Sequence, residues 1–544
     1  MKRIVKGILA SSLFLALTAS VAWAGPERLS SELRANGFRN ARGGSKIDVI
    51  VRYKSPLAEA NHRRIARLGG SLRRSFDGIQ SAHYSIPRSA LKDLEDNPDV
   101  EYVSPDRPIK GMLDITRGAM HANFENALGF TGKGIGVAVI DSGIADMAEF
   151  RDGWNSRIVF SASFVGGGAA DAYGHGTHVA GIIGSDGSGG VYVGMAPGAN
   201  LINLRALDAN GNGTDSSVIQ AIFTAILLKN RYNIRVLNLS LGRPVFEPAY
   251  RDPLCLAAEA AWKAGIVVVV SAGNGGRDNS QGTQGYGTIT APGNDPYVIT
   301  VGAMNTRGTT DRSNDVITSY SSKGPTTFDH FAKPDIVAPG NKIVSTLPAG
   351  LTLSNEFPQN QVSPDFFSLS GTSMATPVVS GAAALMLQQN PSLTPDQIKA
   401  RLMRTATKKF PQFSVNVDPD TNIPYTTYYD VFTVGAGYLD VRAAMNDTVV
   451  SSGYALSPTA ILDSNGQISL TGVDGQNVVW GANVVWGANV VWGAGNVHGN
   501  NVVWGAKVIA GPATVILNNV VWGANVVWGN GASVSDMTQI VGEP

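Results

Sequence analysis

Long runs of apolar residues, each closed by a polar residue or a glycine, recur through the middle of the chain. They read GIGVAVID (134–141), LINLRAL (201–207), IRVLNLS (234–240) and IVVVVS (266–271). Continuous rather than alternating apolar character is typical of strands buried on both faces, as in a parallel sheet. Helical patterns such as TDSSVIQAIFTAILLKN separate the runs. This alternation predicts an α/β domain over residues 111–450, built on a doubly wound, mostly parallel sheet.

Residues 46–110 follow another pattern, in which strand-like and helix-like stretches alternate as strand, helix, strand, helix, strand. This order fits a small ferredoxin-like α+β unit. The polar, glycine- and arginine-rich residues 25–45 that precede it are typical of a linker.

The first 24 residues combine a basic start, an apolar stretch over 8–21 and a closing Ala-Trp-Ala. This is the pattern of a secretory signal, and its apolar core is short for a membrane span. Cys255 is the only cysteine, so an exported chain would contain no internal disulfide. We expect Cys255 to be a small buried side chain in a helix, because no histidine adjoins it to activate the thiol. The net charge of +1 gives no indication of nucleic acid as a partner.

The C-terminal extension, residues 451–544, contains NVVWGA hexads between 477 and 530. Their tryptophans keep spacings that are multiples of six, at Trp480, Trp486, Trp492, Trp504, Trp522 and Trp528. A repeat too small to bury its own face must stack on its neighbours, which predicts a β-rich tail with glycine turns. If three hexads formed one coil, the second, fourth and fifth of these tryptophans would form a column. The rings then serve either as the core of a solenoid or as a surface that stacks on sugars.

Polar residues close several of the predicted buried strands, where ligands bind in open α/β sheets. Asp141 ends the first run and Asn274 lies in a glycine-rich turn just beyond the fourth. A carboxylate at the end of a buried strand needs a hydrogen-bonding or cationic partner, unless Asp141 merely caps a turn. Asn274 is either an ordinary Asx-turn residue or a fixed amide donor for an oxyanion.

Two histidines, His175 and His178, stand three apart at the start of a predicted helix in GHGTHVAGIIG. Neither the glutamate of an H-E-x-x-H motif nor a cysteine accompanies them, which argues against a metal site. Gly174 and Gly176 leave room around the first ring. We therefore interpret His175 as a candidate base and His178 as a structural residue.

Ser373 opens the helical pattern TSMATPVVSGAAALML. A serine there can cap the helix, and Pro377 is compatible with an early helical position. Alternatively Ser373 is a nucleophile, since Asp141, His175 and Asn274 supply an orienting acid, a base and an oxyanion donor.

The motifs VAVIDSGI, HGTHVAGII, NLSLG, SAGN and GTSMATPVVSGAAAL, in this order, resemble those of subtilisin-family serine peptidases, the subtilases. The similarity runs over about 116–449 and includes KPDIVAPG. It implies a catalytic triad of Asp141, His175 and Ser373. It also implies an oxyanion hole made by Asn274 and the backbone N–H of Ser373.

The same resemblance implies that substrate pairs as an extra strand with two segments and enters a pocket. The residues implied are Ser240, Leu241 and Gly242 on one side, Gly211, Asn212 and Gly213 on the other, and Ser271, Ala272, Gly273 and Thr290 at the pocket. Main-chain pairing of this kind gives breadth rather than specificity. Arg243 stands where many relatives have glycine and is expected to alter the pocket rim.

Residues 46–110 resemble the subtilase propeptide, a folding chaperone and temporary inhibitor, with cleavage expected near 110–113. The alternative is a permanent extra domain. Relatives often hold calcium in the loop after the histidine helix, here SDGSGGVYV (185–193). Ser188 replaces a common amide ligand, although Glu149 could supply a carboxylate. We expect no cofactor and no metal in the chemistry, and leave a structural calcium open.

These inferences predict a secreted, self-maturing serine endopeptidase of broad specificity that acts on proteins or peptides. The alternative is a cell-surface or polysaccharide-binding protein whose tail carries the function, while the peptidase domain only processes the chain. Hydrolysis of an unrelated protein would favour the first, and binding of the isolated 451–544 segment to cell walls would favour the second.

Overall fold

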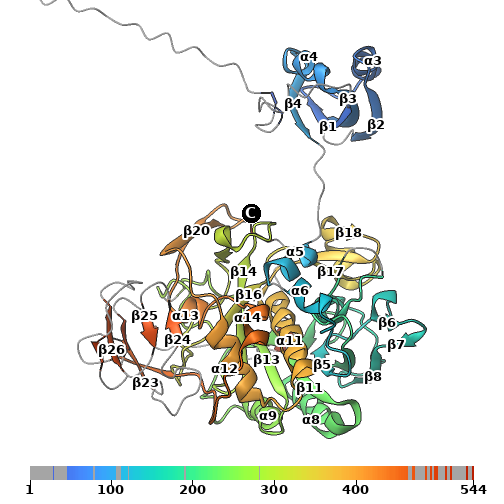
Figure 1. The fold of residues 1–544 in the computed structure, drawn as a ribbon. Helices are drawn as coiled ribbons and strands as arrows, with labels where there is room; N and C mark the ends of the chain where they lie inside the picture. Colours follow the sequence, from blue (N-terminus) through green and yellow to red (C-terminus); the bar gives the residue numbers. More distant parts are fainter. Residues whose placement is uncertain are drawn as a thin grey trace, which may run out of the picture. The chain divides into compact units, whose positions relative to one another are not determined.

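The computed structural model describes most of the chain between residues 46 and 471 and short pieces outside it. The described residues are 28–29, 33, 46–76, 80–105, 112–120, 122–188, 192–280, 282–462, 468–471, 484–486, 490–492, 495–499, 509–510, 515–517, 534–536 and 542–543. The chain forms two compact units, residues 1–109 and 110–544 (Figure 1). Each unit is described by itself.

In the part that the structure describes, the first unit is a four-stranded antiparallel sheet with the helices α3 and α4. Its elements are β1 (Lys46–Tyr53), α3 (Glu59–Arg67), β2 (Ser71–Phe76), β3 (Ser81–Pro87), α4 (Leu91–Glu95) and β4 (Val100–Pro105). The strand order β2-β3-β1-β4 with this chain order is the ferredoxin-like pattern. Strand β2 is an addition to the pattern expected from the sequence.

The predicted linker 25–45 differs in part from the structure, because two of its leucines belong to the core of this unit. Leu29 and Leu33 are fully or nearly fully buried with Val49, Val103 and their neighbours. The N–H of Val103 donates to the carbonyl of Arg28 at 2.7 Å. Burial of two leucines contributes a few kcal/mol to a small unit whose core is otherwise thin.

The second unit is built on a mostly parallel sheet, as its apolar runs predict. Its strands are β5 (Gly136–Asp141), β8 (Ile158–Ser163), β9 (Asn200–Arg205), β11 (Ile234–Leu239), β13 (Val267–Ser271), β14 (Ile299–Asn305), β15 (Val316–Ile317) and β16 (Ile336–Pro339). They follow the order β15-β14-β13-β11-β5-β9-β8, with β16 also paired to β14. Every pair is parallel except β14 with β15. The predicted α/β fold with a mostly parallel sheet is confirmed.

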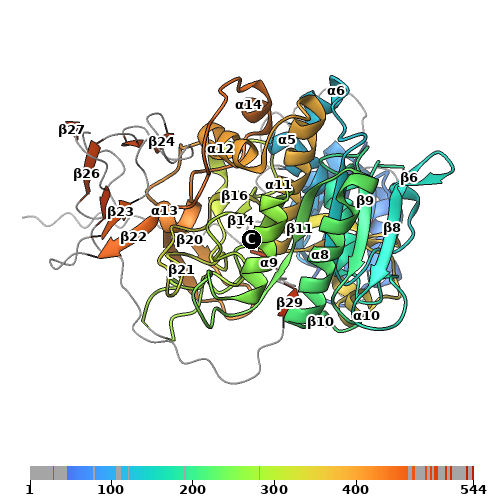
Figure 2. The ribbon, with the colours of Figure 1, turned by 90° about the horizontal axis from the view of Figure 1, so that it is seen from below.

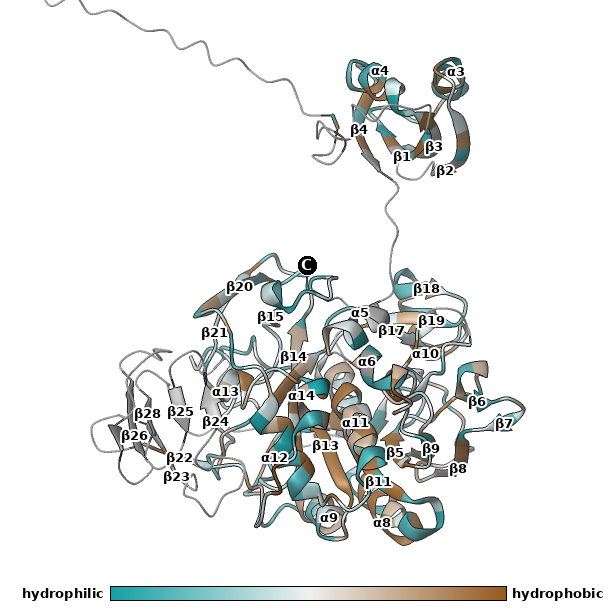
Figure 3. Cartoon of the chain, in the orientation of Figure 1, coloured by the Kyte–Doolittle hydropathy of each residue, from teal (hydrophilic) through white to brown (hydrophobic). Residues whose placement is uncertain are grey.

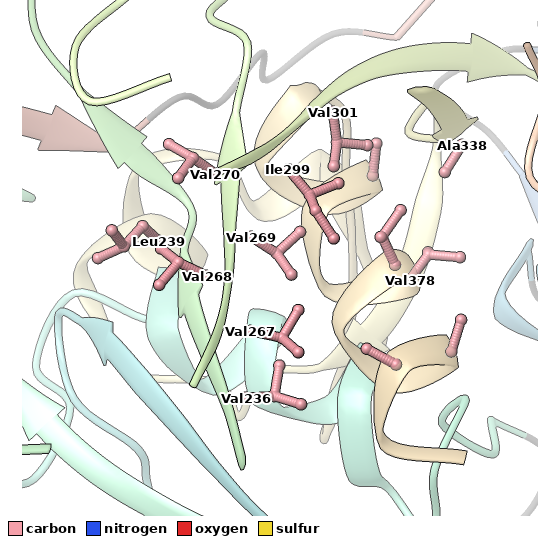
Figure 4. Packing of buried hydrophobic residues seen from close by; sticks show 14 of the residues in the cluster. Val236, Leu239, Val267, Val268, Val269, Val270, Ile299, Val301, Ala338 and Val378 are labelled. Atoms are coloured by element: carbon pink, nitrogen blue, oxygen red, sulfur yellow. The ribbon is translucent and has the colours of Figure 1, made fainter. Parts of the chain in front are cut away.

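Two helix pairs pack on this sheet. Helix α7 (His175–Gly184) contacts α11 (Thr372–Gln389), and α8 (Asp215–Tyr232) contacts α9 (Pro253–Lys263). Residues 372–387 of α11 are all buried, because this helix lies against β11, β13, β14 and β16. Val236, Val267 and Val378 show this packing in close view (Figure 4), and the strands form the hydrophobic interior (Figure 3).

The strand order fixes where a ligand can bind. The chain passes from β5 to β8 and β9 on one side, and then crosses to β11, β13 and β14 on the other. The order therefore reverses at β5, and in open α/β sheets ligands bind outside the carboxyl ends of strands at such a point. Asp141 is the last residue of β5.

Shorter elements surround the sheet. They are α5 (Met112–Ala119), α6 (Ala122–Ala127), β6 (Arg151–Asp152), β7 (Asn155–Ser156), β10 (Asn212–Gly213), β12 (Leu241–Gly242), β17 (Ile343–Thr346), α10 (Thr352–Glu356), β18 (Gln361–Ser363), β19 (Phe366–Leu369), α12 (Pro395–Thr405), β20 (Phe413–Val417), β21 (Pro424–Tyr428), α13 (Val431–Val434) and α14 (Val441–Asn446). Among the helices that the structure describes, none combines the length and the apolar character needed to cross a membrane.

The packing of the second unit continues past the predicted boundary at 450. Strands β22 (Thr459–Leu462) and β23 (Ile468–Thr471) pair, and Ala455, Ala460 and Leu470 are buried in the main core. The hydroxyl of Ser457 donates to the buried carboxylate of Asp335 at 2.6 Å. The start of the extension is therefore part of the α/β unit rather than a separate tail.

The described pieces of the repeat region are short strands. Strands β24 (Val484–Trp486) and β25 (Val490–Trp492), from adjacent hexads, pair antiparallel. Strands β26 (Gly495–Gly499) and β28 (Val515–Leu517) pair in parallel with His498 opposite Ile516, three hexads further on. The parallel pair fits a three-hexad coil and the antiparallel pair does not. Trp504 and Trp522 of the predicted column lie outside the described residues, as does the predicted signal 1–24.

Candidate active site

Asp141 and His175 form a buried pair at the carboxyl end of β5. The Nδ1 atom of His175 lies 2.7 Å from Oδ1 of Asp141, and both side chains are fully buried. The backbone N–H of Ser142 also donates to this oxygen at 2.7 Å. An aspartate that accepts from Nδ1–H holds the imidazole in the tautomer whose Nε2 is basic. The pair can thus serve as an oriented general base.

Gly176 lets helix α7 approach the turn after β5 closely enough for this contact. A Cβ atom at Gly176 would lie 2.2 Å from the carbonyl oxygen of Gly143, which no neighbouring shift could relieve cheaply. The N–H of Gly176 donates to the hydroxyl oxygen of Ser142 at 2.9 Å. Gly176 therefore does not leave open space around the ring of His175. It allows the backbone of α7 to lie directly against the turn that follows β5.

Asp171 is a buried carboxylate that the motifs did not single out. It accepts from the N–H groups of Gly174 at 2.8 Å and Thr177 at 2.9 Å, and from the hydroxyl of Ser142 at 2.9 Å. Burial raises the pKa of Asp171, while these hydrogen bonds act to lower it. A carboxylate ahead of a helix binds the free N–H groups of the first turn, and Asp171 thereby fixes α7 against the turn after Asp141. The sequence feature that could have identified Asp171 is its position four residues before His175, just ahead of the predicted helix.

Ser373 is the second residue of α11 and is held by Ser240. Its hydroxyl donates to the Ser240 carbonyl at 2.9 Å, and the Ser240 hydroxyl donates to the Ser373 carbonyl at 2.8 Å. Pro377 lies beyond the first turn of the helix and has no N–H to give the carbonyl four residues earlier, which is that of Ser373. The Ser240 hydroxyl supplies the missing donor. Asn238 donates to the same hydroxyl oxygen at 2.9 Å and fixes its orientation.

Asn274 presents an amide donor beside the start of α11. Its Oδ1 accepts from the N–H of Thr372 at 3.0 Å and from the Thr372 hydroxyl at 3.1 Å. Its Nδ2 is buried and has no acceptor among the residues that the structure describes. An amide fixed through its oxygen, with its N–H groups unused, is suited to a negative charge that appears only during a reaction.

The residues predicted to bind substrate lie on two short strands and a neighbouring turn. Strand β10 contains Asn212 and Gly213, and β12 contains Leu241 and Gly242. Ser271 turns its hydroxyl to the Leu241 carbonyl at 3.2 Å, so its side chain supports β12 rather than facing a ligand. The hydroxyl of Thr290 lies 3.3 Å from the carbonyl of Ala272, next to Gly273. These contacts bring the predicted pocket residues together at the carboxyl ends of β11 and β13.

The prediction that Arg243 alters the pocket rim is wrong, because its side chain is buried in ion pairs. Arg243 is 5% exposed and makes a two-pronged ion pair with Asp215, through Nε at 2.8 Å and Nη2 at 2.9 Å. Its Nη2 also lies 2.8 Å from Asp252, the cap of α9. A guanidinium that is satisfied in this way ties β12 to the starts of α8 and α9.

His178 and Cys255 are structural, as predicted. The Nε2 of His178 donates to the carbonyls of Ile343 at 3.1 Å and Phe367 at 3.0 Å, and so joins β17 to β19. Burial is the main cause that lowers the pKa of His178 from 6.5 to about 3. Cys255 is buried, its thiol donates to Asn294, and burial raises its pKa well above the usual range. A thiol in this state is a poor nucleophile.

The neutral state of His178 predicts a loss of stability in mild acid. The unfolded chain takes up this proton near pH 6.5 and the folded chain only near pH 3, so the contribution is intact above 6.5 and falls between these values. Between pH 6.5 and 4.5 this residue alone should cost roughly 2–3 kcal/mol of unfolding free energy. The measurement is urea unfolding against pH in a Ser373→Ala background, which removes the candidate nucleophile. In His178→Gln, which keeps a donor but does not titrate, the pH slope should flatten; an unchanged slope would show that other groups cause it.

The structural calcium stays a prediction. Glu149 is 2% exposed, one of its oxygens has no partner among the described residues, and burial raises its pKa, with Asp365 and Asp186 adding to the shift. A buried carboxylate near like charges suits a cation. However, the described residues contain no group of three histidine, cysteine, aspartate or glutamate side chains placed to hold a metal. Ser188 donates its N–H to Asp186, and 189–191 lie outside the described residues.

Comparison with known proteins gives one family. A sequence profile described as the subtilase family matches residues 132–420, which include all four residues of the site. Serine protease AprX of Bacillus subtilis (strain 168) is 36% identical over 393 residues, 68% of this chain and 85% of that protein. Subtilisin E of the same organism is 34% identical over 390 residues, 69% of this chain and 89% of that protein. Subtilisin DY of Bacillus licheniformis is 37% identical over 321 residues, 58% of this chain and 93% of that protein.

Proposed function

The chain belongs to the subtilase family and is a serine endopeptidase, and from this premise we propose that it is a secreted enzyme that matures itself and tolerates many substrate sequences. Two observations support the proposal. Asp141 and His175 form a buried pair at the carboxyl end of β5. Contacts with Ser240 and Thr372 hold Ser373 and Asn274 near the carboxyl ends of β11 and β13. The four candidate residues come from four segments that share no local structure.

In the proposed mechanism Ser373 is the nucleophile and His175 its base. The Ser373 hydroxyl, which donates to the Ser240 carbonyl at rest, turns to Nε2 of His175 and gives up its proton as Oγ attacks the substrate carbonyl. Asp141 stabilises the imidazolium that forms. His175 then returns the proton to the leaving amine, the peptide C–N bond breaks, and water hydrolyses the acyl-enzyme by the same route.

The oxyanion of the tetrahedral intermediate is stabilised by Nδ2 of Asn274 and the backbone N–H of Ser373. Both are oriented before substrate arrives, Asn274 by Thr372 and Ser373 by its place at the start of α11. The positive end of the helix dipole adds to this stabilisation. No step of this chemistry needs a metal.

Broad specificity follows from strand-like binding. Strands β10 and β12 offer backbone groups that any extended peptide can pair with, whatever its side chains. Residues near Thr290 line the adjoining pocket. They do not indicate which substrate side chain the pocket prefers.

Secretion and self-maturation rest on the N-terminal sequence and the first unit. Residues 1–24 carry the pattern of a signal peptide, and the 46–110 unit has the ferredoxin-like pattern expected of a propeptide that is folding aid and inhibitor. Since α5 begins at Met112, a bond before that residue suits cleavage better than one inside the helix. The unit boundary between 109 and 110 lies close to the same place.

The experiment is intact-mass analysis and N-terminal sequencing of the parent and of Ser373→Ala. We expect the parent to lose about 110 residues while the variant stays whole; the size follows from the unit boundary. Identical cutting of both would mean that another enzyme matures the chain. If neither is cut, the propeptide assignment fails. The relatives do not favour the alternative of a binding protein; binding of an isolated 451–544 segment to cell walls would revive it.

A further inference from the structure

A short strand near the C-terminus lies between the two strands assigned to substrate. Strand β29 (Val534–Asp536) pairs antiparallel with β10 on one side and with β12 on the other. Figure 2 shows β29 beside β10. The resulting sheet has the order β10-β29-β12, so β29 is its central strand. An added central strand is the position that an extended peptide substrate would take.

The pairing register shows that β29 runs toward Ser240, as the chain of a bound substrate would. Ser535 lies opposite Asn212 on one side and Gly242 on the other, and Asp536 lies opposite Leu241. The tail therefore advances from Gly242 through Leu241 toward Ser240, whose carbonyl accepts from the Ser373 hydroxyl. Residues on the acyl side of a bond to be cut must approach the nucleophile in this direction.

A second attachment holds the end of the tail. Glu543 is fully buried: its N–H donates to Asn341 at 2.8 Å, and its carbonyl accepts from Asn341 Nδ2 at 2.9 Å. Its carboxylate accepts from the N–H of Ser319 at 2.8 Å and from the Ser319 hydroxyl, and pairs with Arg277 at 3.0 Å. These contacts all fall on Oε1 of Glu543, and Oε2 is buried without a partner among the described residues. A charge-assisted contact that also pairs the backbone of the residue is a built site rather than a chance contact.

Two of the residues beside this end of the tail lie in the same segments as Asn274 and Ser373. A Cβ at Gly542 would lie 2.3 Å from the hydroxyl oxygen of Ser370, three residues before Ser373. Arg277 follows Asn274 by three residues. One attachment thus lies next to Ser240, which accepts from the Ser373 hydroxyl, and the other lies against Ser370, three residues before Ser373.

We propose that the C-terminal tail is an intramolecular competitive inhibitor of the peptidase: Val534, Ser535 and Asp536 occupy the substrate strand position, and Glu543 anchors the tail. The proposal rests on the assignment of β10 and β12 as substrate strands. While the tail is in place, an external peptide cannot pair with these strands. The apparent affinity for substrate is therefore the intrinsic affinity multiplied by the fraction of molecules in which β10 and β12 are free. The chemistry at Ser373 is unaffected once the tail has left.

The test compares hydrolysis of a short chromogenic peptide by the parent, by Glu543→Gln and by a chain that ends at Ala532. Glu543→Gln removes the ion pair but leaves Arg277 its contact with Asp418, at 2.7 Å. Glu356→Gln, an exposed glutamate, is the matched control. We expect KM to fall several-fold in Glu543→Gln and about tenfold in the shortened chain, with kcat unchanged and no change in the control. Equal KM values in all four chains would overturn the proposal.

A second measurement avoids any dependence on folding of the shortened chain or on loss of the tail. A synthetic peptide of residues 531–544 is added to the parent and to the shortened chain, and intact mass records each C-terminus. The peptide should inhibit the shortened chain competitively, and a peptide with Gln for Glu543 should bind roughly tenfold more weakly. Absence of inhibition would refute the tail's role. If no chain hydrolyses any peptide, the proposed peptidase function fails instead, so the two failures are distinguishable.

Discussion

Replacing Ser373 with alanine should lower kcat on a short peptide about 10⁶-fold, with KM nearly unchanged. The change removes the oxygen that forms the acyl-enzyme, while the Asn274 donor and the strand contacts of β10 and β12 remain. The magnitude is taken over from subtilisin itself, whose triad serine shows this loss. The measurement is steady-state hydrolysis after removal of the first 110 residues or so by an added protease, since Ser373→Ala cannot mature itself.

Non-additivity is the control for this result. His175→Ala should cost about as much as Ser373→Ala, and the double variant should be no worse than either, because the two residues act as one unit. Additive losses would show that the buried Asp141–His175 pair does not act through Ser373. Thermal unfolding of each variant separates lost chemistry from lost structure.

Replacing Asn274 with alanine should lower kcat by about 10²–10³ and leave KM within a few-fold of the parent value. The expected size is again that found for the equivalent donor in subtilisin and is adopted from there. The physical reason lies in this structure: Nδ2 has no acceptor among the described residues, so its hydrogen bond is made only to the charge of the transition state. The same peptide assay measures both constants.

Thr372 provides a graded comparison for Asn274. Its hydroxyl and its N–H both hold Oδ1 of Asn274, so Thr372→Ala removes one of the two contacts that orient the amide. We expect a loss of roughly tenfold in kcat, between the parent and Asn274→Ala. A KM increase without a kcat decrease in either variant would place Asn274 in ground-state binding instead.

Strand β29 already pairs with both β10 and β12, the strands that the proposed mechanism assigns to substrate. Maturation at the N-terminus would then leave an enzyme still restrained by its own C-terminus. The described start of the extension, buried through Ala455, Ala460 and Leu470, keeps that end attached to the peptidase unit.

The sequence by itself determined the buried strands, the helices between them and the residues that we assign to the proposed chemistry. Continuous apolar runs specify strands covered on both faces, and Asp141 and Asn274 stand just where such runs end. His175 and Ser373 were assigned from two further motifs, each of which is contiguous in the chain. All of this information is local, within stretches of about twenty residues.

Only the tertiary structure decided which distant groups complete one another. The carbonyl that Pro377 leaves without a helical donor is satisfied by Ser240, more than a hundred residues earlier. Arg243, expected at a pocket rim, is held inward by two aspartates, and a short strand of the tryptophan-rich tail lies between β10 and β12. These outcomes depend on pairing between segments far apart in the chain, which local hydrophobic patterns do not specify because each pattern is compatible with many partners.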